Sequence, residues 1–414
     1  FISNSWLLAS QGFALDEFPR ASYQRFGKDF FDMFTWSGDI TFSRFKAVIP
    51  TGTAADNGIG ANVFNGMPLA AGPPNNVLFN GTQQLSEALS QEGIGDDWST
   101  RVTSMHHVTM PLAWGPVQIT PFAVAQVQGF LQNETSFTNE DTDFRGIGGM
   151  GVHTTTTFQR VYNDVQNETL GINRLRVLMD PWAKAWISGA NFNPIDAPDY
   201  DPLVDATSRG GAVELGLRHR LQTQRGGAGR WYDVDWLTTS VAATFSTSDA
   251  TRRWFTPRWY DNNPLYSSFG NFVNSSFDFR PAEALTFTGE GTWDLDRDGF
   301  TRGAIAMNID HSPRFSSGIA FRYFAVPEEY ETFATPALVN RAKGQLLSFP
   351  IRYEVSKTYM LAVNPQYNFS EDDFQSVAAS LTRRLADFDL LFYVKYDQIR
   401  DETIAGISLS NTKF

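Results

Sequence analysis

The chain has 414 residues, with 33 Lys and Arg against 45 Asp and Glu, so its formal charge is −12. This acidic balance argues against a basic stripe that could neutralise phosphates, so we expect no nucleic-acid partner. Cysteine is absent, which excludes disulfides and thiolate metal sites. The chain has no stretch of about 20 uninterrupted apolar residues, so no transmembrane helix is predicted. Aromatic residues make up 14 % of the chain.

The N-terminal quarter of the chain is the least regular. The sequence begins at Phe1 without Met, and we take it as a processed or truncated mature segment. Residues 1–18 are interpreted as a lead-in segment, and residues 19–414 as one barrel. Candidate strands cover 20–26 and 34–49. Residues 51–98 are rich in Gly, Asn, Pro and Ala and are predicted to form a long loop, outside the cell or folded into the lumen.

From Arg101 onward the sequence predicts strands that follow one another at short intervals. In the first half, strands are predicted over 101–110, 117–128, 145–160, 174–188, 213–222 and 232–246. In the second half, alternating patterns predict strands over 285–296, 302–310, 314–323, 376–382, 390–397 and 403–410. No helix-length segment separates these later strands, so parallel crossovers are excluded and the sheet is expected to be an antiparallel meander.

The stretch from Gln345 to Ser370 carries the strongest pattern. Apolar and aromatic residues alternate with polar ones on both sides of Lys357, and successive strand side chains point to opposite faces. Each half is about ten residues long, which is the length that a tilted strand needs to cross a bilayer. The pattern therefore predicts a transmembrane β-hairpin.

The predicted fold class is all-β, a closed antiparallel transmembrane β-barrel with long loops in its N-terminal half. About 17 strands can be counted, and a closed barrel with both ends on one side needs an even number, so we expect 16 or 18. The lumen of such a barrel is water-filled or partly plugged. A soluble propeller or sandwich would need an internal repeat or a second buried face, and the sequence has neither. The localisation predicted from this fold is the outer membrane.

Polar residues on the alternate face of these strands are predicted to line the lumen. A charged Arg or Lys facing lipid near the bilayer midplane costs about 2–4 kcal/mol, so the lumen is the sensible location for such side chains. The predicted lumen-facing residues are Glu290, Asp294, Arg302, Asn308, Arg314, Arg322, Arg352, Glu354, Asn364, Gln366, Asn368, Lys395 and Asp397.

Several short motifs have simpler explanations than the chemistry they suggest. Gly146, Gly148 and Gly151 match GxGxxG, but a strand pattern follows them, so we expect them to relieve crowding or to mark a bulge in a barrel strand. The acidic stretch from Asp294 to Gly299 lacks the closing Glu of a calcium loop and is predicted to be a hairpin turn. The adjacent His106 and His107 should point to opposite faces. No spacing selects a Ser-His-Asp set, so we expect no enzymatic activity, no metal and no cofactor.

Five segments, taken in order, resemble the barrel domain of the LptD (OstA) family of outer-membrane lipopolysaccharide-assembly proteins, also called organic solvent tolerance proteins. The segments are GFALDEFPRASYQRFG (12–27), WGPVQITPFAVAQ (114–126), FQRVYNDV (158–165), INRLRVLMDPWAKAW (172–186) and VELGLRHRLQTQRGG (213–227).

The resemblance implies that the chain moves lipopolysaccharide, or a similar amphiphile, to the outer leaflet. It also implies as partners outer-membrane lipid, a lipoprotein plug, periplasmic bridge proteins and the barrel-assembly machinery. A lateral seam would join residues 20–26 to 403–410, near Pro19, Tyr23, Gly406 and Ser408. The alternative is a passive porin for small solutes, in which the −12 charge would favour cations and the 51–98 loop would form a constriction. A surface-structure or adhesion barrel would rest on the long loops.

Overall fold

In the computed structural model the fold is one antiparallel sheet. The structure describes residues 2–5, 14–48, 52–53, 84, 86, 98–131, 144–192, 209–227, 229–248, 250, 270–325, 344–370, 372–386, 388–398 and 402–411. The described residues form 21 strands, all hydrogen-bonded into this sheet. Within the described residues, no helix is long and apolar enough to span a membrane.

The strands follow the chain order. The first eleven are β1 (Ile2–Ser5), β2 (Ala14–Phe30), β3 (Phe34–Val48), β4 (Ser99–Thr109), β5 (Leu112–Trp114), β6 (Val117–Leu131), β7 (Phe144–Thr156), β8 (Phe158–Asn167), β9 (Ile172–Ala190), β10 (Gly210–Arg225) and β11 (Tyr232–Ser246). The others are β12 (Phe272–Ala282), β13 (Leu285–Asp294), β14 (Gly299–Ser312), β15 (Phe315–Phe324), β16 (Gly344–Ser348), β17 (Ile351–Glu354), β18 (Tyr359–Asn368), β19 (Asp373–Arg384), β20 (Phe388–Asp397) and β21 (Glu402–Asn411).

Each strand pairs with its neighbours in the chain, as a meander requires. Three segments continue a preceding one: β4 and β5 both pair with β6, β7 and β8 both pair with β9, and β16 and β17 both lie between β15 and β18. Counted with the short β1, the 21 segments therefore make 18 passes. This number agrees with the larger of the two predicted strand counts.

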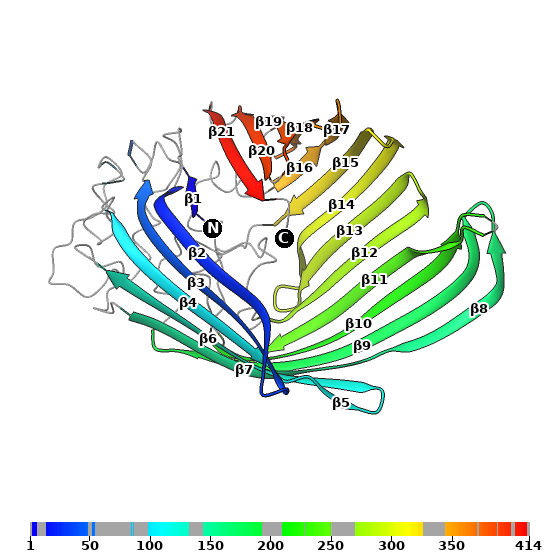
Figure 1. Ribbon diagram of the computed structural model, residues 1–414, viewed down its shortest axis with the longest axis horizontal. Helices are drawn as coiled ribbons and strands as arrows, with labels where there is room; N and C mark the ends of the chain where they lie inside the picture. The colour runs from blue at the N-terminus through cyan, green and yellow to red at the C-terminus, as the bar shows by residue number, and fades with distance from the viewer. Residues whose placement is uncertain are drawn as a thin grey trace.

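The sheet curls strongly on itself (Figure 1). Strands β2 to β4, β6 and β7 rise from the bottom of the view to the left, β9 to β15 rise to the right, and β16 to β21 complete the upper part. The described ladder ends at β1, which pairs with β2, and at β21, which pairs with β20. No hydrogen-bonded pair joins β1 or β2 to β21 among the described residues.

The predicted hairpin at 345–370 is confirmed, with one interruption. Ile351 pairs with Val363 and Tyr353 with Leu361 across the turn at 355–358. The first strand breaks at Pro350, because proline has no N–H to donate to the ladder. Its carbonyl still accepts the N–H of Gly318 at 2.9 Å, so the chain stays attached to β15.

The sheet differs from the prediction in its first strands. The strand predicted over 20–26 is the 17-residue β2, and its register shifts between Glu17 and Arg20, around Pro19. The strand predicted over 145–160 is divided at Thr157 into β7 and β8. Strands β1, β5 and β12 were not predicted. Of the 51–98 loop, the structure describes an isolated bridge between Thr53 and Gln84, and most of the loop lies outside the described residues.

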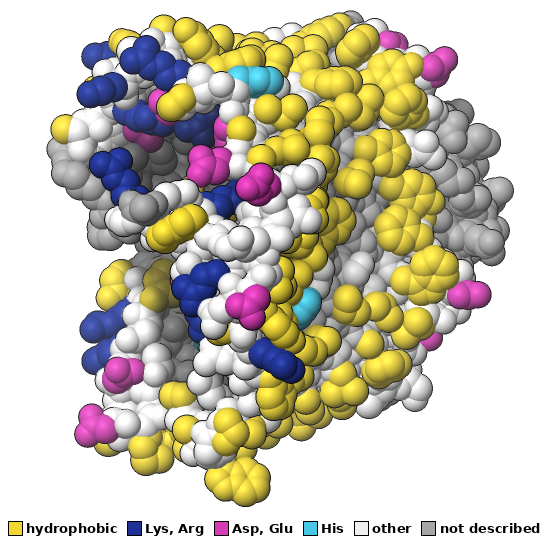
Figure 2. All heavy atoms as spheres, turned by 90° about the vertical axis from the view of Figure 1, so that its right-hand side faces the viewer, with side chains coloured by type: hydrophobic (Ala, Val, Ile, Leu, Met, Phe, Trp, Pro, Cys, Tyr) yellow, Lys and Arg dark blue, Asp and Glu magenta, His cyan; other side chains and the backbone are white. Residues whose placement is uncertain are grey.

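The two faces of the sheet differ in chemistry. One face, here called the apolar face, carries exposed side chains such as Ile305, Tyr353, Leu361 and Val394, each 39–53 % exposed. Hydrophobic side chains cover much of the surface in Figure 2, and charged side chains gather towards its left edge, where the surface is hollowed. Because the register alternates, the opposite face holds the intervening residues, and we call it the polar face.

Candidate functional site

The polar face of the sheet is the candidate site, and most of the predicted lumen residues lie on it. The pairing register places Glu290 beside Ala304, Arg302 beside Thr292, and Arg322 beside Ala304. The same face carries Asn308, Arg352, Glu354, Asn364, Gln366, Asn368 and Lys395. That this face lines a water-filled lumen remains a prediction.

Two predicted residues lie at turns instead of in the middle of a strand. Arg314 belongs to the β14–β15 turn and is exposed, so the strand predicted to begin there begins at Phe315. Asp294 ends β13, and its carboxylate accepts the N–H groups of Asp296 at 3.0 Å and Arg297 at 3.3 Å. The acidic stretch is therefore a hairpin turn, as predicted. The side chain of Asp397 lies outside the part that the structure describes.

The predicted seam differs from the described pairing. Tyr23 lies on β2 and Gly406 on β21, but these strands do not pair with each other among the described residues. Instead, Ala21 of β2 lies opposite Ile2 of β1. Pro19 is exposed at the irregular part of β2, and the Ser408 side chain lies outside the description.

Hydrogen bonds and ion pairs organise the polar face in two regions. Near the central hairpin, Glu354 accepts a hydrogen bond from Arg384 at 3.1 Å and lies 3.5 Å from Arg352. These arginines are more than a third exposed, so each ion pair stabilises the fold by no more than about 1 kcal/mol. On β9 and β10, Asp180 pairs with Arg220 at 3.0 Å. Both regions keep charged groups fixed along the strands.

Polar contacts also link residues of β8 and β9. Arg176 donates to Gln159 at 2.7 Å, and Arg174 donates to Asn163 at 2.6 Å. Gln159, Arg174 and Arg176 line a hollow of about 460 Å³ that also includes Gln224 and Asp233. Most side chains around this hollow are polar.

A second hollow, of about 570 Å³, lies on the polar face of β2 to β10. We call it the inner cavity. Its carboxylates, histidines and lysine come from five strands and are Asp39, His107, His153, Lys184 and Glu214. None of these residues is predicted as a site from the sequence, although the position of His107 beside His106 is. The signal that was available is a lysine flanked by tryptophans in the strand predicted over 174–188.

Lys184 and Glu214 lie side by side in the inner cavity, on β9 and β10. Lys184 is 6 % exposed, and its Nζ lies 4.6 Å from the ring centre of Trp186. In register, Lys184 lies between His153 on β7 and Glu214 on β10. Glu214 Oε1 accepts the indole N–H of Trp182 at 2.9 Å, so this carboxylate is held by the wall of the sheet.

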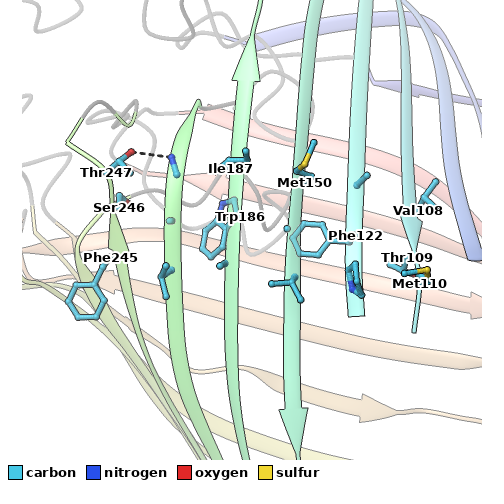
Figure 3. A pocket seen from close by; sticks show the side chains of 18 of the residues that line it. Val108, Thr109, Met110, Phe122, Met150, Trp186, Ile187, Phe245, Ser246 and Thr247 are labelled. Atoms are coloured by element: carbon cyan, nitrogen blue, oxygen red, sulfur yellow. Dashed lines mark hydrogen bonds between the residues drawn. The ribbon is translucent and has the colours of Figure 1, made fainter. Parts of the chain in front are cut away.

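On the apolar face, a groove of about 880 Å³ crosses β4 to β11. Figure 3 shows Met150, Ile187 and Phe245 on separate strands along this groove, and the Thr247 hydroxyl accepting the N–H of Gly211 at 3.1 Å. Its lining is almost entirely apolar, which suits contact with lipid and not with an aqueous solute.

Two short motifs behave as the sequence predicts. His106 stacks on Trp36 on one face, whereas His107 packs against Phe122 on the other, so the adjacent rings do point apart. Gly151 of the glycine motif leaves room for the Phe122 ring, because a Cβ at this position would clash with that ring. Gly148 has open space around it, so crowding explains only part of the motif.

Comparisons with known proteins give no family for the chain. No family model matches it, and no curated protein matches it. Among solved structures, a Rhodopseudomonas blastica porin mutant is 11 % identical, with 77 % of this chain and 92 % of the porin covered and a TM-score of 0.36. The FrpB iron transporter from Neisseria meningitidis is 9 % identical, with 93 % of this chain and 60 % of the transporter covered and a TM-score of 0.39.

The identification with the LptD family is therefore wrong. The structures found are porins and iron transporters, and neither family models nor curated proteins support LptD. The expectation that a lipoprotein plug and periplasmic bridge proteins are partners came from that resemblance alone.

The fold and the chemistry of the two faces define the class of this protein. One antiparallel sheet of tilted strands, apolar and exposed on one face and polar on the other, is the architecture of an outer-membrane β-barrel protein. The predicted localisation in the outer membrane agrees with this architecture.

Proposed function

We propose that the chain is a passive channel that lets small hydrophilic solutes diffuse across the outer membrane. The observation that carries the proposal is the regular alternation across β13 to β20. This alternation places Arg302, Arg322, Glu354 and Lys395 on one face, while Ile305 and the apolar side chains around it lie on the other. Because lipid would penalise these charges, the polar face lines a conduit.

The size of the sheet supports an aqueous path. A barrel of 16–18 strands leaves a channel, whereas eight strands leave room for little more than side chains. The 18 passes of this sheet are in the wider range.

The charge of the wall does not support the cation preference expected from the whole chain. Of the 33 Lys and Arg residues, 26 lie in the described part, against 24 of the 45 Asp and Glu residues. The described part is therefore close to neutral, and the excess of acidic residues lies elsewhere in the sequence. We expect weak selectivity between simple cations and anions.

Liposome swelling tests the proposal. Vesicles containing the refolded chain should swell in isotonic arabinose and more slowly in larger sugars such as raffinose, because passive diffusion depends on solute size. Vesicles that contain the heat-denatured chain provide the baseline. Swelling no faster than this baseline, with folded protein present in the membrane, would contradict the channel.

A further inference from the structure

The inner cavity has two halves of different chemistry. The side chains of Phe26, Met105, Phe122 and Val124 supply an apolar surface. His107, His153 and Lys184 supply groups that can donate hydrogen bonds or carry positive charge. A mostly apolar hollow with a few convergent polar groups is the usual form of a small-molecule site.

Lys184 is the residue of the inner cavity whose charge a bound anion would stabilise most. It is 6 % exposed, and its ammonium lies over the rings of Trp186 at 4.6 Å and Phe122 at 5.6 Å. It forms no ion pair within 4.0 Å in the part of the chain that the structure describes. A buried cation without a paired anion is costly, and aromatic rings offset only part of this cost.

The acidic residue beside Lys184 is held in place by neutral donors. Glu214 lies opposite Lys184 in the β9–β10 register. Its Oε1 accepts the indole N–H of Trp182 at 2.9 Å, and its Oε2 lies 3.5 Å from the Thr244 hydroxyl. These contacts hold the carboxylate against the sheet, so it offsets part of the Lys184 charge without pairing with the ammonium directly, and the ammonium can still donate hydrogen bonds to a group in the cavity.

The two histidines add hydrogen-bond donors beside Lys184. His153 lies directly beside Lys184 on β7, and His107 lies on β4 beside Phe122. Neither ring forms a hydrogen bond with another described residue. A neutral imidazole retains one N–H donor, so each ring can donate to an anion whatever its charge.

We propose that the inner cavity binds a small amphipathic monocarboxylate, with its carboxylate at Lys184 and His153 and its hydrocarbon part against Phe122 and Met105. The inference rests on the proposed channel, because it names a class of solute that the channel would select. Asp39 and Glu214 also line the cavity, so two carboxylates accompany the one ammonium of Lys184, and this disfavours a phosphate dianion more than a monoanion.

Phenylacetate is a suitable probe, and phenylacetamide is its neutral counterpart of similar shape. Binding to the refolded chain in detergent micelles is measured by calorimetry. We expect phenylacetate to bind at least about tenfold more tightly than phenylacetamide, because an ammonium–carboxylate contact is a charge-assisted hydrogen bond. Inorganic phosphate should bind more weakly than phenylacetate.

The Lys184→Met variant removes the charge and keeps an unbranched side chain against the aromatic rings. We expect it to lose at least about tenfold in phenylacetate affinity. Lys357→Met is the matched control, because Lys357 is exposed in the turn between β17 and β18 and does not line the cavity; the affinity of this variant should equal that of the wild type. Should Lys184→Met fail to fold, His153→Gln carries the same test with a smaller expected loss.

Equal affinity for the acid and the amide, or an unchanged affinity in both variants, would overturn the site. The outcome is separable from that of the channel, since binding is measured in micelles and needs no conduction. A chain that swells liposomes without preferring phenylacetate loses only the site. A chain that binds phenylacetate but does not swell liposomes keeps the site and loses the channel.

Discussion

Replacing Ile305 with Arg tests which face of the sheet meets lipid. Ile305 lies near the middle of β14, pairs with Gly289 and Phe321, and is 53 % exposed on the apolar face. A cation at this depth costs about 2–4 kcal/mol if the face meets hydrocarbon. Ala304, the preceding residue, lies on the polar face opposite Glu290. Arg at position 304 would lie between the Glu290 carboxylate and the Arg322 guanidinium, whose attraction and repulsion largely offset each other, so the change should cost less than about 1 kcal/mol.

The two variants are compared by reversible denaturant unfolding in phospholipid vesicles, followed by tryptophan fluorescence. We expect Ile305→Arg to lower the free energy of unfolding by at least about 1 kcal/mol more than Ala304→Arg, which is roughly a fivefold change in the equilibrium constant. Equal losses, or a larger loss for Ala304→Arg, would refute the assignment of the faces.

Two further changes test the packing and the register. Gly216→Ala places a Cβ against the Trp182 ring, so we expect the free energy of unfolding to fall by about 1–3 kcal/mol in the same assay. Gly148 has open space around it, so Gly148→Ala should cost much less. Equal losses in the two variants would argue against this packing. Val377 and Tyr396 face each other on β19 and β20, so cysteines at both positions should form a disulfide on oxidation, detectable on a non-reducing gel, and failure to do so in the folded protein would contradict the register.

The alternation of side chains explains why much of the sheet could be predicted. A strand exposes every second residue to the same face, so a lipid-facing strand carries a readable pattern in one sequence. The strand predicted over 232–246 has the bounds of β11, and the hairpin at 345–370 pairs as expected. The same alternation placed Arg302 and Lys395 on the polar face.

Irregular strands were harder to predict because local geometry replaces the pattern. Strand β12 places Ser275 on the apolar face, opposite Gly291, so its alternation is incomplete. The four residues of β1 are too few to show any period. The break at Thr157 separates two segments that pair with the same strand, and nothing in the residue types announces it.

The inner cavity could not be predicted, because its residues meet only after the sheet has formed. Gln24 and Glu214 both line it although 190 positions separate them. Strand order and register decide that Lys184 lies beside His153, and neither can be read from one strand alone. The mistaken family resemblance has a related cause, since short segments of alternating aromatic and polar residues are common to membrane strands of many barrels.

The most direct test of the proposed channel is the conductance of the refolded chain in a planar lipid bilayer. An aqueous conduit along the polar face predicts steady, stepwise increases in current with a nearly linear dependence on voltage. It also predicts a reversal potential close to zero in a potassium chloride gradient, because the described wall is nearly neutral. A bilayer that stays silent although folded protein has inserted would contradict the account.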